Sequence, residues 1–389
     1  METSTDRILT THVGSLPRPL DLFELLTDED QGRLADPAAL EARVAAAVHD
    51  IVARQVDTGI DIVSDGEMGK IAYTFYVKHR LSGIQAGQPP GASVPEDVVN
   101  LDMQEHPDFA EQARKARAGW ALQYGRPWVV GPLSYENRAP MDRDIAHLNA
   151  AVGAAKPKEA FMNAASPGVL SKFVPNDYYK DENSYIAAMA DAMKTEYKAI
   201  VDAGFILQID DPGLGETWDM MIPHPTMEEY RKLQVMYIEA LNHALNGIPE
   251  DRVRYHLCWG SWQGPHLGDL SLRDVVDLIL SVNAQAYSIE AANPQHSWEW
   301  KVWEDVKLPD NKVLIPGVIA HTTAVVEHPE TVAERIINYA RVVGKERVIA
   351  GADCGFAQGA LYARQHLSIM WAKFEALAEG ARLASQRLK

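Results

Sequence analysis

The sequence is short of cysteine, of positive charge and of long apolar runs. It has only two cysteines, so a disulfide-rich secreted domain is not indicated, and two isolated cysteines are better explained as thiols or metal ligands. Lys and Arg number 37 against 54 Asp and Glu, and the net charge of −17 disfavours nucleic-acid or anionic membrane partners. The chain shows neither a membrane-spanning run nor an export signal at METSTDRILTTH. We therefore expect a cytoplasmic protein.

What the sequence does contain is an alternation of short β-branched or aromatic runs with longer helical patterns, which is typical of a parallel α/β fold. The clearest helix begins at Asp36 and Pro37 and ends at Gly59. Further helices are expected at 186–204, 226–246, 329–343 and 363–387. The length allows one domain or two, and we expect a single catalytic domain over 1–389.

Nine strand candidates can be recognised, one more than an eight-stranded barrel needs. In order they read LTTHVGS, IDIVSDGE, PWVVGPLS, AFMNAAS, FILQIDD, RYHLCW, AYSIEAA, VLIPGVI and RVIAGAD. Nearly all end in small or polar residues, and the C-terminal ends of the strands are where a TIM barrel keeps its active site. We expect a TIM (β/α)8 barrel with inserted loops. The Pro- and Gly-rich segment 81–118 is expected to be an insertion after the second strand, and it is a candidate lid.

His256 and Cys258 form the first candidate site, because residues i and i+2 of a strand face the same side. Such a pair alone is more often a buried thiol beside a core histidine. The other cysteine, Cys354, ends another strand candidate, and Glu290 ends a third. Together they offer one imidazole, two thiolates and one carboxylate, a set that suits zinc. The sequence therefore predicts a Zn²⁺ site at the C-terminal ends of the strands.

These residues lie in phrases that resemble a known family. TTHVGSLPRP, SDGEMGK, LQIDDP, HLCW, SIEAAN, the GV of LIPGVIA, and ADCGF occur in the order found in the C-terminal catalytic barrel of cobalamin-independent methionine synthase. The resemblance extends along nearly the whole chain and implies a TIM-type barrel. The zinc ligands that it implies are His256, Cys258, Glu290 and Cys354. The homocysteine-binding residues that it implies are Gly14, Ser15, Glu67 and Asp210.

The implied reaction is transfer of a methyl or other alkyl group to a thiol. The thiol would bind zinc, lose its proton and attack an activated carbon. Glu290 is expected to leave the zinc as the thiol arrives, because this exchange conserves the charge at the metal. Glu67 and Asp210 are expected to hold an ammonium group by charge-assisted hydrogen bonds. The alternative for these two carboxylates is pairing with Lys70, with Arg18 or with groups in each other's loops.

The donor of the alkyl group is left open. The family phrase G-V-Y-D-I-H-S reads GVIAHTT here, so Ala320 and Thr322 replace its Asp and His. His321 lies one place early, which turns it to the other face of a strand unless a bulge restores it. Methylfolate and a methyl-carrier protein are two candidate donors.

An epoxide is a third candidate electrophile. SDGEMGK, YVKHRL, AASPG, EAANPQHSWEW, LPDNKVLIPGV and AGADCGFA are similar to a shorter branch of the family that includes epoxyalkane:coenzyme M transferases. Five tryptophans could line an apolar pocket for the electrophile, or they could equally pack helices against the barrel: Trp259, Trp262, Trp298, Trp300 and Trp303.

Three other classes of protein remain open. A zinc metallohydrolase is disfavoured by two cysteine ligands, because hydrolytic sites rely on His and carboxylate. A metal-free decarboxylase on the related porphyrin-binding barrel would need arginines where the strands end in acids. A zinc-stabilised binding protein would unfold when its metal is removed.

Overall fold

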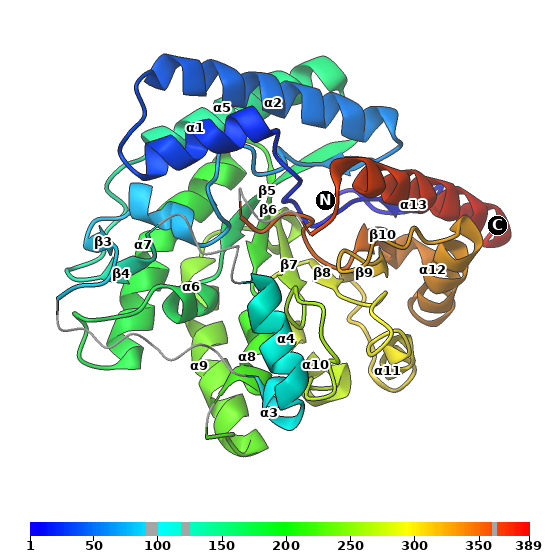
Figure 1. The fold of residues 1–389 in the computed structure, drawn as a ribbon. Coiled ribbons are helices and arrows are strands. Elements are labelled where there is room, and N and C mark those ends of the chain that lie inside the picture. The colour runs from blue at the N-terminus through cyan, green and yellow to red at the C-terminus, as the bar shows by residue number, and fades with distance from the viewer. Residues whose placement is uncertain (91–99, 118–124, 222, 360–363) are drawn as a thin grey trace.

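Eight parallel strands form one sheet in the computed structural model, which describes residues 1–90, 100–117, 125–221, 223–359 and 364–389 (Figure 1). The strand order is β1-β10-β9-β8-β7-β6-β5-β2. A parallel bridge between Thr11 and Ile62 joins the two outer strands and closes the ring. The bounds are β1 (Leu9–Thr10), β2 (Ile62–Val63), β5 (Glu159–Ala165), β6 (Ile206–Asp210), β7 (Val253–Leu257), β8 (Ala286–Ile289), β9 (Val313–Ile319) and β10 (Ile349–Ala352). The predicted TIM barrel is confirmed.

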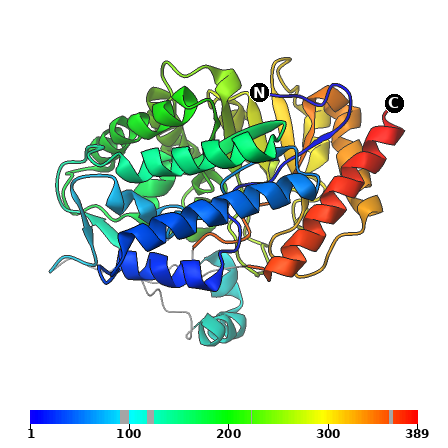
Figure 2. The same ribbon diagram turned by 90° about the horizontal axis from the view of Figure 1, so that it is seen from above.

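Helices surround the barrel, as Figures 1 and 2 show from two sides. They are α1 (Leu20–Asp30), α2 (Pro37–Asp57), α5 (Ala139–Ala155), α6 (Pro167–Phe173), α7 (Glu182–Asp202), α8 (Gly213–Met220), α9 (Met227–Ala244), α10 (Leu272–Leu280), α11 (Val302–Asp305), α12 (Pro329–Val343) and α13 (Leu367–Arg387). Short 3-10 turns are η1 (Phe75–His79), η2 (Glu250–Arg252), η3 (Glu299–Lys301) and η4 (Lys345–Arg347). All five predicted helices are present, although residue 363, where the last was expected to begin, lies outside the described residues and α13 begins at Leu367. Asp36 caps α2 by accepting from the N–H groups of Ala38 and Ala39.

One of the nine strand candidates, the third along the chain, lies outside the barrel. PWVVGPLS forms β4 (Pro127–Val129), which pairs antiparallel with β3 (Ile84–Ala86) in a separate two-stranded sheet. Both strands belong to the long connection between β2 and β5. A strand pattern does not specify its partner, which is why the sequence could not tell which candidate was accessory.

The predicted insertion 81–118 supplies β3, α3 (Leu101–Glu105) and α4 (Pro107–Arg117), while its residues 91–99 and 118 lie outside the described residues. The helical part docks against α8, which follows β6, and against the loop that follows β7. Leu101 N–H donates to Asp219 Oδ1 at 2.8 Å, and Leu267 N–H donates to Asp102 Oδ1 at 3.1 Å. The insertion therefore lies at the end of the barrel where the predicted site lies. Its role as a lid stays a prediction.

The barrel interior changes character along its axis. At the N-terminal ends of the strands it holds an apolar layer: Leu9, Ile62, Phe161, Ile206, Ala286, Val313, Ile315 and Ile349. Two residues further along, β5, β6 and β8 carry the buried side chains of Asn163, Gln208 and Ser288. Arg254 on β7 lies between these layers, with its guanidinium 3.8 Å above the Phe161 ring. The period of two therefore brings polar side chains of β5, β6 and β8 towards the C-terminal end.

Across the described ranges, the helices are too short or too polar to cross a lipid bilayer.

Candidate metal centre and substrate cavity

Three of the four predicted metal ligands come together at the C-terminal end of the barrel. The ligand atoms of His256, Cys258 and Cys354 all lie within 4.8 Å of one another. His256 is on β7, Cys258 follows that strand, and Cys354 follows β10. All three side chains are buried, and the Nε2 atom of His256 has no hydrogen-bond partner in the structure. A buried nitrogen without a partner costs free energy unless a ligand satisfies it.

The two cysteines share one hydrogen bond, from Cys258 Sγ to Cys354 Sγ at 3.5 Å. This bond lowers the pKa of Cys354 well below that of an ordinary thiol, and His256 lowers it further. The same bond, together with burial, raises the pKa of Cys258. The pair therefore forms one thiolate readily, whereas the second requires a cation beside it.

Glu290, the fourth predicted ligand, is close to this cluster but not part of it. It directly follows β8 and is buried. Its Oε2 accepts from the Trp259 N–H and its Oε1 from Asn293 Nδ2, both at 3.0 Å. Burial raises the pKa of this carboxyl group. The structure thus gives Glu290 partners of its own beside the His and Cys side chains.

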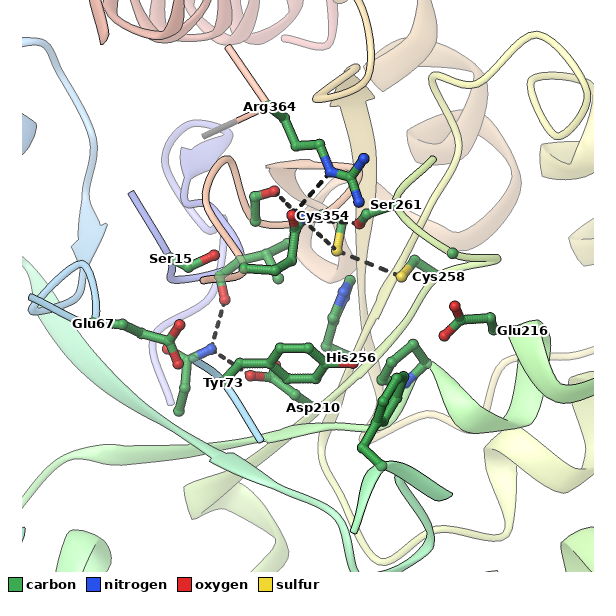
Figure 3. A pocket seen from close by; sticks show the side chains of 17 residues that line it. Ser15, Glu67, Tyr73, Asp210, Glu216, His256, Cys258, Ser261, Cys354 and Arg364 are labelled. Carbon is green, nitrogen blue, oxygen red and sulfur yellow. Dashed lines mark hydrogen bonds between the residues drawn. The ribbon is translucent and has the colours of Figure 1, made fainter. Parts of the chain in front are cut away.

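A cavity of about 200 Å³ opens beside the cluster (Figure 3). His256, Cys258 and Cys354 form part of its wall. Ser15 and Glu67 lie on one side of these ligands and Glu216 on the other, as Figure 3 shows. The cavity therefore has two halves that meet at the cluster.

The first half holds the substrate-binding residues that the resemblance implies. Asp210 ends β6 and accepts from Asn163 Nδ2 at 2.8 Å and from Gln208 Nε2 at 2.6 Å. Burial, together with the charge of Glu67, raises the pKa of Asp210 to about 7. Two buried carboxyl groups in one pocket favour a ligand that brings positive charge.

Glu67 has two features of a functional residue. Its backbone has φ of 57°, which a residue other than glycine rarely adopts without a reason. Its Oε1 lies 3.4 Å from Lys70 Nζ, and its Oε2 is buried with no partner in the structure. Pairing with Lys70, the alternative to substrate binding, is therefore observed for Oε1 alone, and the distance is long for an ion pair. Arg18 binds the backbone oxygen of Glu67 rather than its carboxylate.

Gly14 and Ser15 approach this half through their backbone. Gly14 has φ of 128°, and a Cβ atom there would lie 2.2 Å from Asn163 Oδ1. Only glycine fits this close approach. Ser15 lines the cavity itself, and its carbonyl oxygen accepts from the Phe356 N–H at 2.8 Å.

The sequence analysis missed three further residues that line the cavity: Tyr73, Phe173 and Glu216. Tyr73 and Phe173 form an edge-to-face pair with ring centroids 6.0 Å apart. Glu216, in the first turn of α8 directly after the IDDP phrase, also faces the cavity. An acid one helical turn beyond a strand end was a usable signal for Glu216. Tyr73 comes from the long connection after β2, and no local pattern marked it.

The structure favours packing over a pocket wall for the five tryptophans, because none of them is among the residues that line this cavity. Trp259 and Trp303 are buried, and Trp298 is 45% exposed. Trp262 lines a separate surface groove with Asn293 and Thr322. Tryptophan near a strand end packed against the loops and helices instead, which its size and amphipathic character favour.

His321 reaches the cavity through another side chain. Its Nε2 lies 2.8 Å from Ser261 Oγ, and Ser261 lines the cavity. Burial lowers the pKa of His321 to about 4, so the ring is neutral at pH 7. Where β10 pairs with β9, Gly351 lies opposite Gly317, and the next residue, Ala352, lies opposite Ile319. Strand β9 therefore has one extra residue between the two pairs. This extra residue is the bulge on which the direction of His321 depended.

A family model described as "Cobalamin-independent synthase, Catalytic domain" matches residues 108–372. A methionine synthase of Sulfolobus acidocaldarius is 25% identical over 89% of this chain and 85% of its own length. A methionine synthase of Saccharolobus solfataricus is 24% identical over 98% of this chain and 96% of its own. An uncharacterized Bacillus subtilis protein, YxjH, is 25% identical over 89% of this chain and 86% of its own length.

Two solved structures share the fold. One is a B12-independent methionine synthase from a Shewanella species in complex with selenomethionine, at a TM-score of 0.72 and 20% identity, covering 98% of this chain and 99% of that one. The other is a putative vitamin-B12 independent methionine synthase from Listeria monocytogenes, at a TM-score of 0.66 and 19% identity, covering 97% and 98%.

Proposed function

The chain belongs to the cobalamin-independent methionine synthase family, and we propose that it transfers a methyl group to the sulfur of homocysteine or a related thiol at a zinc ion. The observation that carries the proposal is the convergence of His256, Cys258 and Cys354 beside a cavity. The relatives named methionine synthase support the choice of methyl group and thiol.

The residues at the cluster fit zinc. One imidazole nitrogen without a partner and two touching sulfur atoms make a nitrogen and sulfur donor set, which zinc prefers and which hard cations such as magnesium do not. Zinc is four-coordinate in most such sites, so one position is left for Glu290 or for the substrate. Zinc held there would supply Lewis acidity that lowers the pKa of an incoming thiol.

Glu67 and Asp210 would hold the ammonium group of the thiol substrate. Both are buried in the first half of the cavity, and a cation between them would return Asp210 to its ionised form. Ser15 and the backbone beside Gly14 would orient the substrate carboxylate. These contacts fix the sulfur at the cluster and face it towards the second half of the cavity, where the donor would lie.

Glu290 would leave the metal when the thiol arrives. Exchange of one anion for another leaves the net charge at the metal unchanged, so the exchange needs little reorganisation. On the donor side, Ser261 with His321 is the pair that could move a proton to or from the cavity.

A second candidate is opening of an epoxide by the thiol. Two observations favour it: the aromatic wall of Tyr73 and Phe173, and the presence of Ala320 and Thr322 where the family has Asp and His. The thiol chemistry would be unchanged, and only the carbon under attack would differ.

Zinc K-edge X-ray absorption on the purified protein tests the proposal, with homocysteine, coenzyme M, glutathione and cysteine added in turn. We expect homocysteine to replace an oxygen neighbour of the zinc with a third sulfur at about 2.3 Å. The His256→Ala variant is the control and should lose both zinc and the response. Absence of zinc, or a metal shell that no thiol changes, would refute the proposal.

Assays with two donors then separate the candidates. Product formation from homocysteine and methylfolate supports methyl transfer. Product formation only from coenzyme M and a short epoxyalkane supports the second candidate instead.

A further inference from the structure

The carboxylate of Glu290 has a complete set of partners away from the His and Cys cluster. One oxygen accepts from the Trp259 N–H and the other from the side-chain amide of Asn293, both at 3.0 Å. Glu290 is 1% exposed and Asn293 is 7% exposed, so water does not compete for either contact. A buried carboxylate bound by two N–H donors lies in a stable position.

We propose that Asn293 and the Trp259 N–H form a carboxylate dock, which holds Glu290 off the metal while a thiol occupies the metal's open position. This inference rests on the proposed function. Asn293 is then a positioning residue: it touches neither substrate nor metal and acts through Glu290.

The Asn293 side of the dock is fixed in orientation. Its Oδ1 accepts from the Gln295 N–H at 3.1 Å, so the amide must present its NH₂ group to Glu290. The turn that carries both residues is held by Asp353, whose Oδ1 accepts from the N–H groups of Ala291 and Ala292 at 2.8 and 2.7 Å. Asp353 is the neighbour of Cys354, so this turn is tied directly to the metal cluster.

The Trp259 side is held by packing. The Trp259 ring stacks on His296 with centroids 4.0 Å apart and planes 22° apart, and its Nε1–H donates to Leu270 O at 2.7 Å. The Trp259 N–H is therefore aimed at one place. Since Trp259 is the residue after Cys258, movement of the dock and of that ligand are coupled.

A buried charged cluster lies under the tryptophan. His296 lies between Asp269 Oδ2 and Glu299 Oε2, each at 3.0 Å, and His266 also contacts Asp269 at 2.7 Å. Although burial opposes it, hydrogen bonding to Asp269 and Glu299 raises the pKa of His296 to about 10. Each member of the cluster is paired, so it forms a rigid support rather than a second reactive centre.

The dock predicts that loss of Asn293 affects the binding of the thiol and the binding of zinc in different directions. Without Asn293, Glu290 loses one charge-assisted hydrogen bond in its off-metal position and favours the metal. Loss of one such bond shifts an equilibrium by on the order of 10- to 100-fold. The thiol must then displace a more strongly held carboxylate. Thiol affinity should fall, whereas zinc affinity should stay the same or rise.

The test uses Asn293→Ala, the isosteric Asn293→Asp, and Gln295→Ala as the matched control from the same loop, which keeps its backbone N–H. Zinc affinity is measured by competition with a chelator, homocysteine affinity by calorimetry on the zinc-loaded protein, and folding by the Tm of each protein. We expect homocysteine to bind Asn293→Ala about 10-fold or more weakly. Asn293→Asp should be weaker still, because a second carboxylate repels Glu290 from the dock. Gln295→Ala should match wild type.

Three results would overturn the inference. Unchanged homocysteine affinity in both Asn293 variants shows that the dock does not act on the exchange. A parallel loss of zinc affinity, thiol affinity and Tm shows that Asn293 only maintains the fold. A wild-type protein that binds no zinc overturns the proposed function and the dock together, whereas a wild type that binds both ligands leaves the proposed function intact.

Discussion

The two ends of the barrel are built from the same eight strands, but they differ in whether their buried side chains find partners inside the protein. At the N-terminal end, residues such as Phe161 and Ile206 pack against one another in an apolar layer. At the C-terminal end, buried atoms such as His256 Nε2, Glu67 Oε2 and Asp353 Oδ2 have no partner within the described structure. Buried polar atoms without partners lower the stability of a fold. The difference teaches that the apolar end stabilises the barrel and leaves the polar end free to bind.

The largest effect should follow from loss of a ligand at the polar end. Cys354→Ser should reduce zinc affinity by more than the roughly 10- to 100-fold that loss of an outer-shell partner costs. Thiol alkylation should fall to background. The Tm of the metal-free protein should stay close to that of the wild type, because the apolar layer is intact. Metal analysis, activity and calorimetry on the same preparations check this, and unfolding on metal removal would contradict the comparison.

A change in the apolar layer should lower the stability of the fold and leave the activity of the folded protein close to normal. Phe161→Ala removes a fully buried ring beneath Arg254, and we expect unfolding to require about 3–5 kcal/mol less free energy. Activity per folded molecule should be close to normal. Denaturant titration gives the stability, and Phe161→Leu is the control, with a smaller loss. A variant that is stable but inactive would break the comparison.

Asp210→Asn should change substrate binding and its pH dependence. The hydrogen bonds that we propose between Asp210 and the substrate ammonium group would lose their charge, so KM for homocysteine should rise about 10- to 100-fold. In the wild type KM should rise as pH falls below about 7, where Asp210 takes up a proton. In the variant this rise should be absent. A KM profile between pH 5 and 9 checks it, and identical slopes for the two proteins would contradict the role of Asp210.

The same carboxyl group should affect stability with a definite sign. Its pKa is higher in the folded protein than in the unfolded chain, so its contribution favours folding below about pH 4 and is lost as pH rises through about 7. The metal-free, substrate-free wild type should therefore lose stability over this range, and Asp210→Asn should lose less. Denaturant titrations at several pH values measure the difference.

The smallest effect is expected for Trp298→Ala. This side chain is 45% exposed and lines no wall of the cavity. Its replacement should change the free energy of unfolding by no more than about 0.5 kcal/mol. It should leave unchanged both KM for the thiol and KM for the alkyl donor. Tyr73→Ala, in contrast, should raise KM for the donor. A donor-specific defect in Trp298→Ala would restore the tryptophan pocket that the structure argues against.

The polar end was partly visible in the sequence because each strand places its last residues there by the period of two. His256, Cys258 and Asp210 could be assigned to one end of a barrel from local pattern alone. The aromatic wall could not, because Tyr73 arrives from a connection of nearly a hundred residues, and tryptophan near strand ends had an equally good use in packing. The side-chain position of Glu290 could not be predicted either, since it depends on Trp259 and Asn293, which belong to two different loops.

The accessory strand shows the same limit. Residues 127–129 have the composition of a barrel strand, and only their pairing with Ile84–Ala86 removes them from the ring. Local sequence specifies that a segment is extended, whereas its partner is decided by chain segments far away. The bulge that directs His321 likewise depends on how β9 pairs with β10.

The division of the cavity into two halves has an evolutionary consequence. The half that we propose for the thiol contains Ser15, Glu67 and Asp210, which follow or end barrel strands, whereas Glu216, on the other side of the cluster, belongs to helix α8. Mutations in the connecting segments can alter the electrophile without disturbing the nucleophile. Under the proposed function, a lineage with this architecture can acquire new alkylating agents by changes in the segments that connect the strands, while selection keeps the thiol-binding half unchanged.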